Sequence, residues 1–132
     1  MNLARDEMFF RMVYLELLKN KKLRTVFRPG NRLYPNPKGY QIGEIVTARV
    51  IEVPGNDSSE VIPKFTKDRF RIRISDIAIK PIEKLVEEDF DGSSPDVTNI
   101  LQLKYHLGLI YNQPAGAFDN QEVTRINFYY ID

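Results

Sequence analysis

Hydrophobic and polar residues alternate along four stretches of the chain in the way typical of β-strands with one covered face. These stretches are Leu23–Arg28, Glu44–Val53, Phe70–Ile79 and Val123–Ile131. The strands of a parallel sheet covered on both sides read instead as nearly continuous apolar runs. The alternation therefore predicts mostly antiparallel pairing, with one face of the sheet packed on a core.

The start of the chain has helical periodicity. Apolar residues recur at three- and four-residue spacing from Leu3 to Leu18, and Asn2 is a candidate N-cap. The segment Lys19–Lys22 then places cations where the last carbonyls of a helix favour positive charge. We expect one N-terminal helix that ends in this lysine-rich segment.

Two further helices are expected between the last two strands. Pro81 predicts the start of a short helix that runs through Phe90, because proline is favoured at the first helical position. Ser94-Pro95-Asp96 supplies a cap, a first-turn proline and a first-turn acid, so a second helix is expected from there to about Tyr111.

The elements and the loops together predict a fold class. Asn31–Gly39 and Pro54–Pro63 are rich in turn-forming residues and are expected to be loops. The resulting order is helix, three strands, two helices, strand. It favours a single α+β domain over residues 1–132, with a small, highly curved and mostly antiparallel sheet or barrel flanked by helices.

Composition narrows the classes of function. The 132 residues are 42% hydrophobic and 28% charged, as in ordinary soluble domains. The absence of cysteine excludes disulfides and thiolate zinc sites and favours a reducing compartment. Asp6 and Glu7 interrupt the region where a signal peptide needs an apolar run, and no membrane-length segment follows. We expect a cytoplasmic protein without a membrane partner.

No residue pattern predicts a metal or a cofactor. His106 is the only histidine and is expected to be a surface or half-buried helix residue. Glu87, Glu88 and Asp89 are adjacent, and neighbouring residues on a helix point in different directions, so they are interpreted as a solvated face. No glycine-rich phosphate loop is present either.

Charge is separated along the chain although the net charge is only +1. Six cations without an intervening acid occupy the basic segment, which we define as Lys19–Arg32, and acids dominate Glu83–Asp96. A local basic patch can steer an anion even when the total charge is small. A solvated strand face explains the basic segment equally well, and a solvated helix face is the preferred interpretation of the acidic one.

Several short phrases occur in an order that resembles the ASCH domain, a branch of the PUA-like superfamily. They are Lys21–Arg28, the Tyr40-x-x-Gly43-Glu44 phrase, Arg71–Ile77, Ile82–Phe90 and Val123–Phe128. The resemblance covers nearly the whole chain. It implies a PUA-like β-barrel with peripheral helices, and a function in binding RNA or in acting on nucleosides or RNA.

The resemblance also bears on a possible reaction. In members that hydrolyse acylated cytidine, a Lys-x-x-Thr pair works with a downstream Glu, and Lys22 and Thr25 keep that spacing. Phe27 stands where such members have Arg, with Arg28 one residue later. The Glu expected shortly after the Asp89-Phe90 phrase is absent, since Asp91-Gly92-Ser93-Ser94 stand there, so the pattern favours an RNA-related surface over a defined reaction.

Three hypotheses follow. The first is a module that binds RNA or a nucleotide-like ligand, with cations on the phosphates and tyrosines stacking on bases, although packing of the tyrosines is the stronger alternative. The residues are Lys21, Lys22, Arg24, Arg28, Arg32, Tyr34 and Tyr40. The second is a small hydrolase acting on a modified nucleoside or RNA, with Thr25 as nucleophile and Lys22 as its activator. The third is a non-catalytic protein-interaction module.

Overall fold

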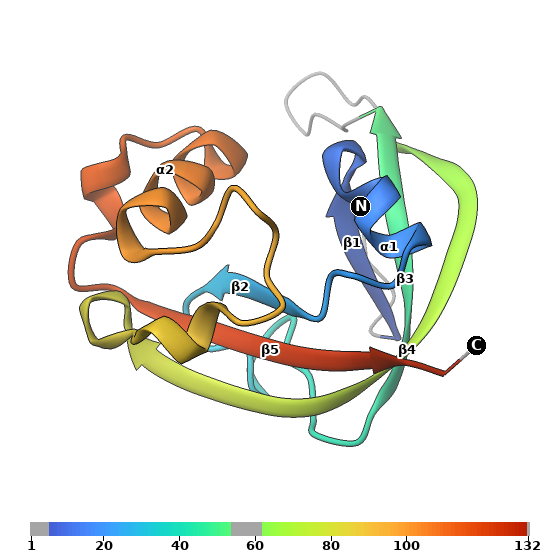
Figure 1. Ribbon diagram of the computed structural model, residues 1–132, viewed down its shortest axis with the longest axis horizontal. Coiled ribbons are helices and arrows are strands. Elements are labelled where there is room, and N and C mark those ends of the chain that lie inside the picture. The colour runs from blue at the N-terminus through green and yellow to red at the C-terminus, as the bar shows by residue number, and fades with distance from the viewer. Residues whose placement is uncertain (1–5, 54–61, 132) are drawn as a thin grey trace.

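A mixed sheet organises the computed structural model, which describes residues 6–53 and 62–131. Within these residues the sheet has five strands in the order β1-β3-β4-β5-β2 (Figure 1). The strands are β1 (Glu7–Arg11), β2 (Thr25–Pro29), β3 (Ile45–Val53), β4 (Lys64–Pro81) and β5 (Glu122–Tyr130). All neighbouring pairs are antiparallel except β1 and β3, which are parallel. The expected α+β class is confirmed.

The long strand β4 gives the sheet its curvature. Its first half pairs with β3 and its second half pairs with β5. The register with β5 shifts between Ile74 and Asp76, and the register with β3 shifts between Arg49 and Val53. Such irregularities bend a strand and increase its local twist. The sheet therefore curls into a half-barrel, with β1 at one edge and β2 at the other.

The prediction of one N-terminal helix is largely wrong. Glu7–Arg11 forms strand β1, followed by a 3-10 turn, η1 (Met12–Tyr14), and a short helix, α1 (Leu15–Lys19). Met8 and Phe10 alternate into the core while the strand pairs with β3, and this tertiary pairing overrides the helical spacing of the apolar residues. Asn2 and Leu3 lie outside the described residues.

The lysine-rich end of that helix is where the sequence places it. The amide of Lys21 donates to the carbonyl of Leu18 at 3.1 Å, and the amide of Lys22 donates to the carbonyl of Leu17 at 2.8 Å. Lys21 itself has a φ of 57°. This is the Schellman arrangement, in which a left-handed residue closes the last turn and satisfies two carbonyls.

The two later helices differ from expectation at their starts. Pro81 ends β4, and the expected helix through Phe90 is replaced by two 3-10 turns, η3 (Ile82–Lys84) and η4 (Glu87–Phe90). The second helix, α2 (Ile100–Tyr111), begins six residues after Ser94. Asn99 is its cap, because its side chain accepts from the amide of Gln102 at 2.8 Å. This cap satisfies the first turn locally, where Ser94 does not.

The loops fall partly within the described residues. Asn31–Gly39 contains no strand or helix, as expected, apart from an isolated bridge between Leu33 and Tyr40. Most of the predicted loop Pro54–Pro63 lies outside the described residues. No helix in the described part of the chain is long and apolar enough to cross a membrane.

Buried apolar side chains form two separate cores. The first lies between α1, η1 and the half of the sheet around β1 and β3, and the second lies between α2, the 3-10 turns and the half around β2 (Figure 1). The first core contains Met8, Phe10, Tyr14, Leu18, Leu23, Val46, Ala48, Val50, Ile72, Ile74, Ile126 and Phe128. The second contains Phe27, Ile82, Leu85, Phe90, Val97, Leu103, Leu107, Phe118 and Val123. This division leaves space between them.

The second core can be tested with two leucines of α2. Leu107 is fully buried, whereas Leu109 is 57% exposed. We expect Leu107→Ala to lower the free energy of unfolding by about 2–5 kcal/mol, because it removes packed methyl groups and leaves a cavity. The matched Leu109→Ala should change it by less than about 0.5 kcal/mol. Urea unfolding of both variants measures the difference, and equal losses would contradict this placement of α2.

Candidate functional site

A cavity of about 650 Å³ lies between the two cores. Its wall contains Phe10, Tyr14 and Leu23 of the first core, and residues of the second core complete it. Those of the second core are Phe27, Val97 and Leu103. Because η1, β1 and β2 contribute together with α2, the two halves of the molecule meet at this cavity.

Arg28 spans the cavity from β2 to β1. Its Nη2 donates to the carbonyl oxygen of Phe9 at 2.8 Å, and its guanidinium carbon lies 5.5 Å from the centre of the Phe10 ring. The side chain is half-buried. An arginine presents five N–H donors, so one bond to Phe9 leaves the guanidinium with donors for an anion.

Three further cations line the same cavity. They are Arg11, Arg32 and Lys38, of which Arg11 and Lys38 are exposed and mark the mouth. Arg32 uses its Nε to bond the carbonyl of Pro29 at 2.9 Å, which leaves its Nη groups outside that contact. Glu7 is a carboxylate on the wall, but Arg49 pairs with it at 2.8 Å. The mouth is therefore positive.

The two candidate tyrosines occupy different positions on the wall. Tyr34 is 47% exposed at the mouth. Tyr40 is half-buried against the first core, and its hydroxyl donates to the carbonyl of Glu7 at 2.9 Å. Tyr40 is thus a packed residue with one face on the cavity, whereas Tyr34 is the more exposed of the two.

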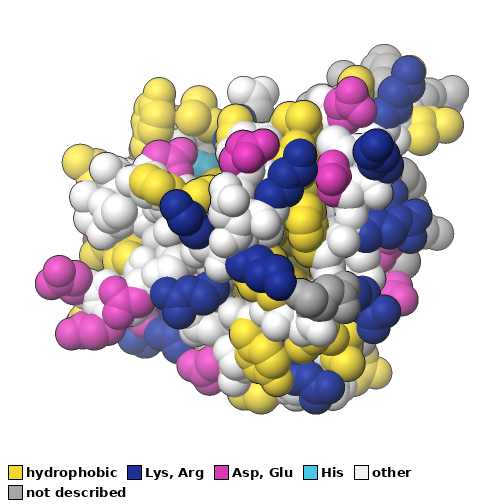
Figure 2. Space-filling view, turned by 45° about the vertical axis from the view of Figure 1, so that its right-hand side comes forward, with side chains coloured by type: hydrophobic (Ala, Val, Ile, Leu, Met, Phe, Trp, Pro, Cys, Tyr) yellow, Lys and Arg dark blue, Asp and Glu magenta, His cyan; other side chains and the backbone are white. Residues whose placement is uncertain are grey.

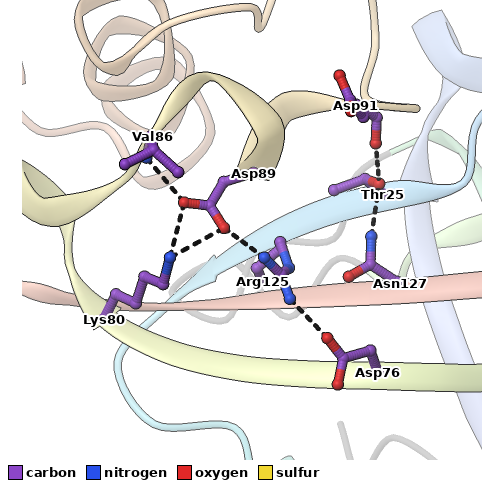
Figure 3. Close-up of polar contacts among 8 residues, drawn as sticks. All are labelled: Thr25, Asp76, Lys80, Val86, Asp89, Asp91, Arg125 and Asn127. Atoms are coloured by element: carbon purple, nitrogen blue, oxygen red, sulfur yellow. Dashed lines mark hydrogen bonds and ion pairs between the residues drawn. The ribbon is translucent and has the colours of Figure 1, made fainter.

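Thr25 lines the cavity, but its hydroxyl is engaged by the protein. The Oγ1 atom donates to the carbonyl of Asp91 at 2.5 Å and accepts from Nδ2 of Asn127 at 2.7 Å (Figure 3). The residue is 1% exposed. A nucleophile needs a base to take its proton, and here a backbone carbonyl holds that proton. This geometry does not favour the proposed role of Thr25 as a nucleophile.

The remaining cations of the basic segment lie elsewhere. Lys21, Lys22 and Arg24 are exposed and do not line the cavity. Figure 2 shows a face on which Lys and Arg side chains stand in several separate groups, with hydrophobic and acidic side chains between them. Among the described residues no carboxylate forms an ion pair with Lys22, so the hypothesis that Lys22 activates Thr25 gains no support from a neighbouring acid.

A pair that the sequence did not predict joins the two sides of the cavity. The hydroxyl of Tyr14, from η1, bonds Nε2 of His106, from α2, and both side chains are buried. Burial raises the pKa of Tyr14 to about 12, and nearby Asp96 adds to the rise. Burial also lowers the pKa of His106, which opposes the effect of Asp96. Both groups are therefore neutral at pH 7.

A second polar cluster corrects the interpretation of Asp89 as part of a solvated face, whereas Glu87 and Glu88 are exposed as expected. Asp89 is only 2% exposed and pairs with Lys80, at 2.9 Å, and with Arg125 (Figure 3). Arg125 also pairs with Asp76 at 2.6 Å. Burial alone would raise the pKa of Asp89, but the Val86 amide and the two cations together hold it below its ordinary value. This cluster fixes η4 to β4 and β5.

No family model matches the chain, and no curated protein matches it. Solved structures do. The crystal structure of hypothetical protein PH0355 has a TM-score of 0.58 and 16% identity, and the match covers 95% of this chain and 97% of that one. An ASCH domain from Lactobacillus crispatus JV V101 has a TM-score of 0.51 and 11% identity over 89% of this chain and 70% of that one. The chain has an ASCH-like fold.

A third structure supports the same conclusion about this ASCH-like fold. Protein EF3133 from Enterococcus faecalis V583, of the DUF984 family model, has a TM-score of 0.50 and 12% identity over 89% of this chain and 69% of that one. At these identities the likeness concerns the ASCH-like fold alone.

The Tyr14–His106 pair predicts a pH dependence of stability. Because burial holds the pKa of His106 below 6.5 in the folded state, the unfolded chain binds this proton first as pH falls. The free energy of unfolding should therefore decrease below about pH 6.5, and the contribution is present above that pH. Chemical unfolding from about pH 8 to about pH 5 measures it.

His106→Gln is the control for this dependence. His106 is the only histidine in the sequence, so the difference between wild type and variant isolates its titration. Asp96, Arg11 and Arg28 are the charged groups that act on it. Identical pH profiles for the two proteins would show that His106 is not buried in its neutral form.

The Asp89 cluster gives a second prediction for stability. Asp89→Ala should lower the free energy of unfolding by about 3–5 kcal/mol, because it leaves two cations without their shared, buried partner. Asp76→Ala removes the exposed partner of the same Arg125 and should cost no more than about 1 kcal/mol. Thermal or urea unfolding compares them, and a similar small loss in both would show that Asp89 is solvated after all.

Proposed function

We propose that this protein binds single-stranded RNA and takes one unpaired nucleotide into the cavity between its two cores. This proposal is supported by the lining of the cavity, which combines an apolar, partly aromatic wall with arginines. A nucleotide combines a base, which has a large apolar face, with a charged phosphate. The apolar wall suits the base, and the arginines suit the phosphate. The ASCH-like fold is consistent with an RNA-related role.

The phosphate is assigned to Arg28 and Arg32. Both side chains line the cavity. Each guanidinium donates a hydrogen bond to a backbone carbonyl, which holds it in place. Guanidinium groups bind phosphate oxygens through two parallel N–H donors, which gives direction as well as charge. A ligand phosphate at the mouth would take up the donors that these backbone bonds leave.

The base is assigned to the cavity behind these arginines. Tyr34 at the mouth can stack on it, as aromatic side chains do on unpaired bases. A base in a duplex is stacked and paired, so it cannot enter a cavity without first leaving its partner. Single-stranded RNA should therefore bind in preference to duplex RNA.

Arg32→Ala is the test of this assignment. It should weaken binding of a fluorescent single-stranded RNA by about tenfold, the loss expected for one charged hydrogen bond. It should also reduce the slope of log affinity against log salt by about 0.7, the value for one contact with a single strand. Fluorescence anisotropy at several salt concentrations measures both quantities.

Arg24→Ala is the matched control. It removes the same charge from the same segment, but Arg24 is exposed and lies off the cavity. The proposal requires a clear difference between the two variants. Equal effects would mean that RNA contacts the outer basic surface, and an absence of binding to any RNA at low salt would reject the function itself.

A further inference from the structure

Three hydroxyl groups form a part of the cavity lining that we call the inner wall, and each of them donates its hydrogen bond to another group of the protein. They belong to Thr25, Ser93 and Ser94, none of which is exposed. The Oγ1 of Thr25 donates to the carbonyl of Asp91 at 2.5 Å and accepts from Nδ2 of Asn127 at 2.7 Å, so the protein already uses this oxygen both as a donor and as an acceptor. The direction of such a bond is fixed, because a carbonyl oxygen can only accept.

The two serines follow the same rule. The Oγ of Ser93 contacts the carbonyls of Phe90, at 2.7 Å, and Val97, at 2.5 Å. The Oγ of Ser94 donates to the carboxylate of Asp96. A serine or threonine hydroxyl has one proton and two lone pairs. With the proton used, each of these oxygens can offer a ligand only an acceptor.

The other polar pair in this part of the wall is also engaged. Tyr14 and His106 bond to each other across the cavity. The charged donors Arg11 and Lys38 are exposed at the mouth, and Arg28 and Arg32 are half-buried. The cations of the cavity wall thus supply donors for an anion, whereas the hydroxyl oxygens of Ser93 and Ser94 supply acceptors.

We propose, on the basis of the proposed RNA function, that the inner wall selects a base that carries an exocyclic amino group. Ser93 and Ser94 supply acceptor oxygens for its N–H donors. Adenine, cytosine and guanine have such a group. Uracil presents carbonyl oxygens on either side of a single N–H, and carbonyls that face acceptor oxygens lose their hydrogen bonds to water without replacement.

Pairs of RNA ligands that differ in this group test the proposal. A short cytidine oligomer should bind about tenfold more tightly than the uridine oligomer of the same length, within the range for discrimination by a buried polar contact. A uridine oligomer with one adenosine should likewise bind more tightly than the same oligomer with purine riboside, which lacks only the amino group. Fluorescence anisotropy at one salt concentration gives both ratios.

Ser94→Ala connects the ratio to the cavity. It should reduce the ratio of the cytidine to the uridine affinity, because it removes one of the acceptor oxygens that only the amino group uses. Ser75→Ala removes an exposed hydroxyl on β4, away from the cavity, and should keep the full ratio. Ser93→Ala provides a second variant, and circular dichroism confirms that each one is folded.

The outcomes separate this inference from the proposed function. Equal binding of the cytidine and uridine oligomers, with Arg32→Ala still weakening both, would reject selection by the inner wall and keep the RNA function. A ratio that persists in both Ser94→Ala and Ser93→Ala would also reject it. If no oligomer binds, the proposed function fails and this inference fails with it.

Discussion

The bond from the Arg28 guanidinium to the carbonyl of Phe9 connects two strands that no backbone hydrogen bond joins. The sheet begins at β1 and ends at β2, and the order of its strands leaves these two as edges. A closed barrel would pair them directly. Here one arginine side chain, at 2.8 Å, spans the opening between them. This contact holds together the two edge strands on either side of the cavity.

How much of the fold the sequence predicts depends on where each element finds its partners. Alternation was sufficient for β3, whose Val46, Ala48 and Val50 are all buried as expected. Alternation was not sufficient for β1, because its five residues, with two adjacent aromatics, also fit helical spacing. What makes this segment a strand is its pairing with β3, about 40 residues further along the chain. Local caps were likewise misassigned, since both Ser94 and Asn99 have side chains suited to capping.

The sequence likewise predicts only part of the candidate site. The candidates Arg28, Arg32 and Tyr34 do line one cavity, and Thr25 lines it too. Lys22 does not, although its spacing from Thr25 matches the family phrase, because the helix end and the strand start direct the two residues to different surroundings. The Tyr14–His106 pair is 92 residues apart in sequence, and no local signal connects such residues. Asp89 was misjudged because its neighbours in sequence are acidic while its partners in space are basic.

Edge strands are the sites at which β-sheet proteins aggregate, because their unpaired backbone N–H and C=O groups can pair with a strand of another chain. In this protein the carbonyls of Glu7 and Phe9 on β1 are occupied by Tyr40 and Arg28. At the other edge, β2 ends in Pro29, which has no amide hydrogen to offer. An incoming chain would have to displace these side chains before it could extend the sheet. The edges beside the cavity are thereby protected against pairing with a strand of another chain.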